Sequence, residues 1–244
     1  PTAYGKTVLE YAKLILKTTA TISSLAVPES KNCMRISTYP SNMISRLLVD
    51  FYNEFSDIYS IEHQEGSVEE VTEHVHQGIS EIGIVYVAQK QVQTFKHIMA
   101  HKNLEFVPLE LKKICLYVGK NNPLYEKESI EFSELQDLKF VGGVKDFYSM
   151  EHHLENVSMG VIDTRNLNHS VHTNSDHLTI NFLLHTDVCS LGLEFMHEPY
   201  WQYDVKSLAI KGCEPFLQIG YVWDPKRHLS KPARWIIKNF KKML

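Results

Sequence analysis

The sequence lacks the patterns that mark metal-binding cysteine motifs, disulfide frameworks and membrane segments. The four cysteines, Cys33, Cys115, Cys189 and Cys213, lie far apart, and none belongs to a CxxC pair. We expect them to be reduced thiols in a cytoplasmic protein. No apolar run approaches the ~18 residues that would span a bilayer, and no secretory signal opens the chain. These absences predict a protein without disulfides and without membrane contact.

Common enzyme signatures are missing as well. GxSxG, the P-loop and GxGxxG do not occur, so we predict no catalytic residue and no cofactor. The 13 histidines include the close pair His97 and His101, but no pair has a Cys or carboxylate at a recognised ligand spacing. We therefore predict surface histidines and no metal. The net charge is −4 with Lys and Arg dispersed, which disfavours extended contact with nucleic-acid phosphates.

The first recognisable feature is a long amphipathic helix. The segment from Thr7 to about Ala26 contains no Gly or Pro. Steps of four and three residues place a mostly apolar stripe on one side of it, formed by Val8, Ala12, Ile15, Thr19, Ile22 and Ala26. This stripe could pack on the chain's own domain or on a second copy as a coiled-coil-like seam. Pro28, Ser30 and Asn32 then indicate a linker.

From Cys33 onward the pattern alternates between strands and helices. We predict strands near 34–38, 58–63 and 82–87, separated by a helix that Ser41 or Asn42 caps and by a helix that opens with the capping box Ser67-x-x-Glu70. Later strands are predicted near 106–109, 114–118, 139–141, 169–172, 188–191, 205–210 and 217–223, with helices near 150–157, 176–185 and 232–243. Each half begins with strand, polar turn and helix, which favours two similar α/β lobes. Ligands of such sheets bind at the carboxyl ends of the strands, so a cleft between the lobes is the expected site.

The order of these segments resembles the effector-binding domain of LysR-type transcriptional regulators over nearly the whole chain. Thr2-Ala3-Tyr4-Gly5-Lys6 and the helix after it resemble the family's LTxxG junction and linker helix. Glu65-Gly66-Ser67 resembles its second turn, and Glu81-Ile82-Gly83-Ile84-Val85 resembles its D-L-A-I strand. Val107-Pro108-Leu109 followed by Asn122-Pro123-Leu124 resembles the stretch that leads into its second lobe.

This resemblance implies two Rossmann-like lobes joined by two crossover strands, the fold of type 2 periplasmic binding proteins, after a long linker helix. Residues 1–30 would be the linker and dimerisation helix, residues 33–111 plus 214–244 the first lobe, and residues 112–213 the second. A small metabolite, expected to be anionic, would bind between the lobes of a cytoplasmic dimer or tetramer. DNA would be bound only by a domain preceding this chain. The alternatives are a transporter's solute-binding protein, which shares the architecture, and an enzyme, for which no nucleophile or base can be named.

The predicted ligand contacts lie in the turns after strands. Hydroxyls and free N–H groups at a helix start can hold an anion, and by resemblance this turn also holds the effector. Alternative roles remain open, since Ser41 could merely cap its helix, Ser67 is engaged in its capping box, Tyr86 could be core and Lys145 could be solvated. Asn174 and Ser175 are predicted to cap a helix rather than to touch a ligand. The predicted site comprises Thr38, Tyr39, Ser41, Asn42, Ser67, Tyr86, Gly143 and Lys145.

Overall fold

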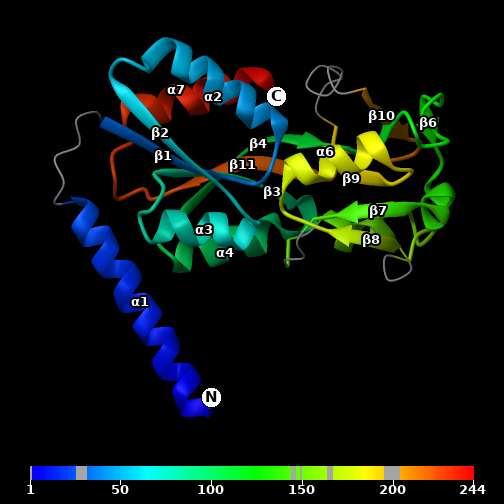
Figure 1. Cartoon of the computed structure of the whole chain (residues 1–244). Helices are drawn as coiled ribbons and strands as arrows, with labels where there is room; N and C mark the ends of the chain where they lie inside the picture. Colours follow the sequence, from blue (N-terminus) through cyan, green and yellow to red (C-terminus); the bar gives the residue numbers. More distant parts are fainter. Residues whose placement is uncertain (1, 26–31, 144–146, 149, 164–166, 195–203) are drawn as a thin grey trace.

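The computed structural model describes residues 2–25, 32–143, 147–148, 150–163, 167–194 and 204–244. Its strands form two separate mixed sheets, each flanked by helices, which makes two lobes side by side (Figure 1). The predicted α/β class with two lobes is thereby confirmed.

The first lobe is a five-stranded sheet in the order β2-β1-β3-β11-β4. Strands β1, β2 and β3 are parallel, and β11 runs antiparallel to both β3 and β4. Helices α2 and α7 cover one face of the sheet and α3 and α4 the other (Figure 1). The strands are β1 (Asn32–Thr38), β2 (Tyr59–Glu65), β3 (Ile82–Ala88), β4 (Glu105–Lys112) and β11 (Leu217–Trp223), and the helices are α2 (Asn42–Phe55), α3 (Val68–His76), α4 (Val92–His101) and α7 (Lys231–Met243).

The central strand β3 shows why both faces need helices. All seven of its residues are buried, which is typical of a parallel strand covered on both sides. Because side chains alternate along a strand, Ile84 and Tyr86 join the core under α2 and α7, while Val85 and Val87 join the core under α3 and α4.

The second lobe is a six-stranded sheet in the order β6-β10-β5-β9-β7-β8. Helix α6 packs across β5, where Leu183 meets Cys115 and Tyr117. The opposite face of β5 contributes Leu116 and Val118 to the main core. The strands are β5 (Ile114–Gly119), β6 (Ser129–Ile130), β7 (Lys139–Gly142), β8 (Asn168–His172), β9 (Cys189–Leu193) and β10 (Val205–Ile210), and the helices are η2 (Phe132–Asp137), η3 (Met150–His153), α5 (Leu154–Val157) and α6 (Asp176–His185).

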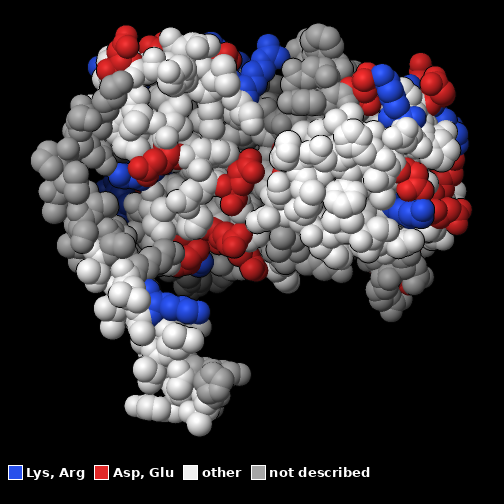
Figure 2. Space-filling model, in the orientation of Figure 1, with Lys and Arg blue, Asp and Glu red and all other residues white. Residues whose placement is uncertain are grey.

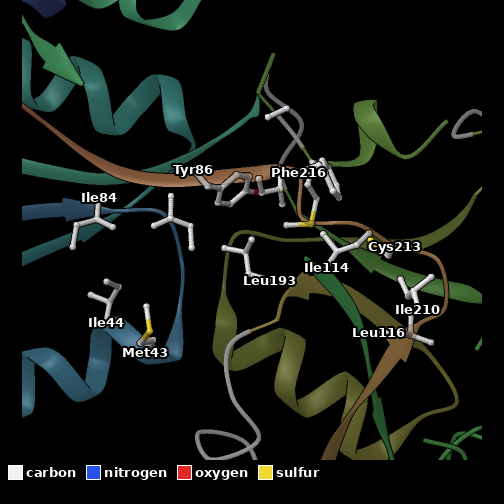
Figure 3. Packing of buried hydrophobic residues seen from close by; sticks show 14 of the residues in the cluster. Met43, Ile44, Ile84, Tyr86, Ile114, Leu116, Leu193, Ile210, Cys213 and Phe216 are labelled. Carbon is white, nitrogen blue, oxygen red and sulfur yellow. The ribbon is translucent and has the colours of Figure 1, made fainter. Parts of the chain in front are cut away.

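The chain crosses between the sheets twice. Strand β4 leads into β5 through Lys113, and β10 returns to β11 through residues 211–216. The apolar core is continuous across this junction, where Tyr86 of β3 and Phe216 lie close to Ile114 and Leu193 of the second lobe (Figure 3). The two lobes therefore share one apolar core where the chain crosses between them.

A segment of the second lobe also reaches into the first. Tyr148 is buried among the residues of α3 and α4, with its ring centroid 5.0 Å from that of Phe95. Beside it, His153 Nε2 and Gln91 Oε1 lie 3.0 Å apart, Gln91 being the last residue of η1 (Gln89–Gln91). The two lobes thus touch at a second place away from the crossover strands.

Two features outside this framework complete the fold. Helix α1 (Ala3–Leu25) extends away from both lobes (Figure 1), and Val8, Ile15 and Leu16 are about half exposed or more. Among the residues that the structure describes, no helix combines the length and apolarity needed to cross a membrane.

Helix α4 is an element that the sequence analysis did not predict. Phe95 and Met99, four residues apart, are its buried positions, and Val92 and Ile98 pack partly buried against the same core. These four positions lie at helical spacing, so the sequence contained the signal for this helix.

The four cysteines are free thiols: three are buried and Cys33 is half-buried. Burial raises the pKa of the Cys115 thiol to about 12, so this thiol stays protonated and unreactive at neutral pH.

Candidate functional site: a cleft between the two lobes

A cleft with a cavity volume of about 120 Å³, partly open to solvent, lies between the two lobes. Its lining combines hydroxyl-bearing side chains, glycine backbone and a comparable number of apolar side chains. The first lobe contributes Tyr39, Pro40, Ser41, Met43, Gly66 and Ser67, and the second contributes Tyr117, Val141, Gly142, Gly143, Met150, Thr173, Asn174, Ser175, Asp176, Thr179, Leu183, Ser190, Leu191, Gly192 and Leu193.

The position of the cleft follows from the direction of four strands. Residues directly after β1, β2, β7 and β8 all line it, namely Tyr39, Gly66, Gly143 and Thr173. β1 and β2 are parallel neighbours in the first sheet, and β7 and β8 are parallel neighbours in the second, so the carboxyl ends of each pair meet at one edge. The site is therefore the edge where ligands of open α/β sheets bind.

The turn after β1 places Ser41 at the N-cap of α2. Its side chain makes no capping hydrogen bond, and the residue lines the cleft. The alternative that Ser41 merely caps its helix is therefore wrong for this structure. Asn42 is the first residue of α2, and its side chain lies outside the described part of the structure.

Ser67 lines the cleft from the second turn and also caps α3. Its hydroxyl accepts a hydrogen bond from the Glu70 N–H at 3.2 Å, and Glu70 Oε2 accepts one from the Ser67 N–H at 2.8 Å. This confirms the predicted capping box. The hydroxyl proton stays available to donate toward the cleft.

Tyr39 and Tyr86 form an aromatic pair behind the first-lobe wall, with ring centroids 4.5 Å apart and planes at 66°. Tyr39 lines the cleft, whereas Tyr86 is only 2% exposed and borders a smaller apolar pocket beneath it. Thr38 is fully buried at the end of β1, and its hydroxyl lies 2.8 Å from His63 Nε2. Thr38 and Tyr86 thus support the wall from behind.

On the second lobe, Gly143 is exposed at the cleft, and a Cβ atom there would lie 3.2 Å from the Tyr39 hydroxyl. The glycine lets the two lobes approach closely. Lys145 lies outside the described residues. Of the eight predicted residues, the structure brings Tyr39, Ser41, Ser67 and Gly143 together in the cleft wall. Ligand contact by any of them stays a prediction.

The start of α6 forms a wall of the cleft that was not predicted from the sequence. Ser175 caps this helix as predicted, its hydroxyl accepting from the Leu178 N–H at 3.3 Å, and it lines the cleft together with Thr173, Asp176 and Thr179. The sequence shows a polar run at residues 173–176, between β8 and α6. Whether this run borders the cleft depends on which strands are neighbours in the sheet.

The carboxyl group of Asp176, which lines the cleft, and that of Glu65, directly before the lining residue Gly66, have shifted pKa values. Burial raises the pKa of the Asp176 carboxyl above its ordinary value. Burial, and then the charge of Asp176, raise the pKa of the Glu65 carboxyl, which belongs to the opposite lobe. His63, on the same face of β2 as Glu65, has its pKa lowered by burial and is neutral at pH 7.

The described residues offer little for metal binding. No group of three or more His, Cys, Asp or Glu side chains in the described ranges could hold a metal ion. The predicted pair His97 and His101 is exposed on α4, with its two Nε2 atoms 3.0 Å apart.

Comparisons with known proteins identify this architecture. A family model described as the LysR substrate binding domain matches residues 35–244. No curated protein matches the chain. The solved structures that resemble it include the effector binding domain of QuiR in complex with shikimate, with 14% identity, a TM-score of 0.57, and coverage of 87% of this chain and 96% of that one.

Two further structures extend the likeness. The C-terminal domain of a probable LysR family transcriptional regulator from Rhodococcus sp. RHA1 has 17% identity and a TM-score of 0.59, over 87% of this chain and 99% of that one. The LysR family transcriptional regulator CbnR has 12% identity and a TM-score of 0.63, over 99% of this chain and 81% of that one. At these identities the likeness establishes the fold.

Proposed function

This chain belongs to the LysR family of transcriptional regulators, as an effector-binding domain, and we propose that a small metabolite bound in the interlobe cleft controls how the whole regulator acts on DNA. Domains of this family are regulatory and non-enzymatic. The transporter and enzyme alternatives therefore have no support from the family match.

The observation that best supports the proposal is that both lobes contribute strand ends to the cleft. Two strand ends from each lobe, followed by Tyr39, Gly66, Gly143 and Thr173, converge on one space. A molecule that touches both lobes binds their closed arrangement more tightly than an open one, and such differential affinity is what shifts a conformational equilibrium. We propose residues 33–111 plus 214–244 and residues 112–213 as the two units that move.

Two relatives support the outline of this mechanism. The effector binding domain of QuiR was solved with shikimate, a small molecule, and full-length CbnR was solved with its target DNA. By analogy, we propose that DNA is contacted only through a separate domain of the regulator and that the protein acts in the cytoplasm. We further propose that α1 joins two copies of the chain.

A substitution that fills the cleft should abolish ligand binding. We expect a metabolite screen by thermal shift to yield a compound that stabilises the chain, and Gly143→Trp to abolish that stabilisation because the indole occupies the space between the lobes. A ligand at 100 times its Kd adds about 2.7 kcal/mol of stability, which is readily measured. Gly143 is exposed, so the variant should fold.

The matched control is Asn168→Trp, at the opposite end of the edge strand β8 from Thr173. Asn168 is exposed, so it tolerates the same bulky side chain without entering the cleft. Equal protection of both tryptophan variants by the compound would show that the effector binds elsewhere.

A further inference from the structure

A small apolar recess lies beneath the interlobe cleft. Its cavity volume is about 20 Å³, and it lies between the helices α2 and α7 and the strands β3 and β11. Each of these four elements contributes a buried side chain to its lining, namely Ile44, Phe240, Ile84 and Ile219. Leu193, the last residue of β9, lines the recess from the second lobe. Both lobes therefore contribute to its lining.

The recess adjoins the cleft. The two spaces share part of their lining, namely Tyr39, Ser41, Met43 and Leu193. Figure 3 shows Met43, Ile84 and Leu193 on different sides of the recess. A methionine side chain is unbranched and adapts its shape easily, so Met43 can make room between the two spaces. A molecule bound in the cleft can therefore place a small group in the recess.

The lining of the recess is chemically unlike that of the cleft. Apart from Tyr39, Tyr86 and Ser41, the described residues that line it have hydrocarbon or thioether side chains. A buried water molecule needs about two to four polar partners, so apolar cavities in proteins stay dry. Protein interiors are otherwise close-packed, and side chains that face a void lose dispersion contacts. An apolar group that fills the recess restores these contacts and removes its own surface from water.

The sizes of the two spaces limit what each can hold. One water-sized group requires about 10–15 Å³ of cavity. The recess, at about 20 Å³, therefore has room for a methyl or an ethyl group. The cleft above it is larger, at about 120 Å³, and its hydroxyl-bearing side chains can bind polar groups, namely those of Ser41, Ser67, Thr173 and Thr179. Together the two spaces favour a molecule with one polar and one apolar end.

We infer that the effector is a small amphipathic molecule whose methyl or ethyl group fills the recess while its polar groups face the hydroxyl-bearing side chains of the cleft. The inference rests on the proposed function, since it names the ligand class of that same cleft. The sequence-based expectation of an anionic effector concerns only the polar end. Because Ile84 belongs to the first lobe and Leu193 to the second, the alkyl group contacts both lobes and favours the arrangement in which they are close.

Two series of probes, each with one polar head and a growing alkyl chain, test this inference. The anionic series is glycolate, lactate, 2-hydroxybutyrate and 2-hydroxyvalerate, and the neutral series is ethylene glycol, 1,2-propanediol, 1,2-butanediol and 1,2-pentanediol. A neutral head is included because Figure 2 shows acidic side chains on the first lobe close to its border with the second, and these would repel an anion.

Amide chemical shifts of the labelled chain measure the Kd of each probe. In at least one series, we expect the member with a methyl or an ethyl group to bind at least about tenfold more tightly than the member without an alkyl group. The propyl member should bind more weakly again because its chain exceeds the recess. The amides of Ile84 and Ile219 should shift on binding, since both residues line the recess.

Ile84→Val enlarges the recess by one methyl group, so we expect the preferred alkyl chain of that series to become one carbon longer. The matched control is Ile82→Val, the same change on the same face of β3. Ile82 is buried but is not among the described residues that line the recess or the cleft, so this variant should keep the wild-type preference. A general loss of stability would weaken all members of the series alike.

The inference is overturned if none of these probes shifts the amides of Ile84 and Ile219, if affinity is independent of chain length, or if the two valine variants have the same preference. A compound from the metabolite screen that has no alkyl group, and whose binding Gly143→Trp abolishes, would overturn the inference and leave the proposed function standing. A compound that protects Gly143→Trp as well as the wild-type chain would remove both.

Discussion

Gly119→Ala is expected to destabilise the second lobe by about 3 kcal/mol or more, at the upper end of the range for overpacked sites. Gly119 ends β5 where α6 crosses the sheet, and a Cβ atom there would lie 1.8 Å from the Leu183 carbonyl oxygen and 2.6 Å from its carbonyl carbon. Both atoms belong to the backbone of α6. The contact cannot be relieved by a rotamer change, so the helix must move away from the sheet.

Displacing α6 would also reach the cleft, because Asp176 and Thr179 near its start line the wall. We therefore expect Gly119→Ala to lower the urea midpoint of unfolding and to weaken ligand binding together. Gly143→Ala is the control, since its new Cβ would meet only the tip of the Tyr39 side chain at 3.2 Å. If the two alanine variants unfold at the same urea concentration, the close packing of α6 on β5 is wrong.

The double substitution Val8→Glu with Ile15→Glu is expected to convert a dimer into a monomer. Val8 is 49% and Ile15 64% exposed on α1, so this face is not buried on the lobes. Most of the stability of a protein helix comes from packing of its apolar face, and α1 has 23 residues with its apolar face left exposed by the lobes. Two negative charges at seven-residue spacing would place like charges in the seam between two copies.

Light scattering after gel filtration measures this directly. The wild-type chain should have about twice its own mass of 28.2 kDa, and the double variant should have the mass of one chain. Lys13→Glu is the matched control, since it changes the net charge by the same amount at an exposed position off the apolar stripe. Dissociation by the control as well would mean that overall charge, rather than the seam, governs assembly.

The fold was largely predictable because its signals are local. The capping box at Ser67 and Glu70 involves two residues three positions apart, and the predicted strands at 205–210 and 217–223 coincide with β10 and β11. Helix α4 was not predicted although Val92, Phe95, Ile98 and Met99 lie at helical spacing and pack on one core. Helix caps, and the alternation of buried and exposed side chains along a strand, depend on residues that are close in sequence. Both can therefore be read from the sequence.

The site was predictable only in part because it depends on strand order. The turns after β1, β2 and β7 could be named as candidates, and Tyr39, Ser41, Ser67 and Gly143 do line one cleft. That Thr173 and Asp176 would lie in the same wall followed from β8 pairing with β7 at the edge of the sheet. The electrostatic interaction of Asp176 with Glu65, 111 residues earlier, is likewise a property of the folded chain.

The central claim, that the interlobe cleft is the effector site, is tested most directly by mapping amide chemical shifts on the labelled chain with the compound found by the screen. We expect the largest shifts at the amides of Tyr39, Ser41, Gly66, Ser67 and Gly143 and of residues 173–176. Large shifts confined to α1, or to surfaces away from these turns, with the cleft amides unmoved, would contradict it.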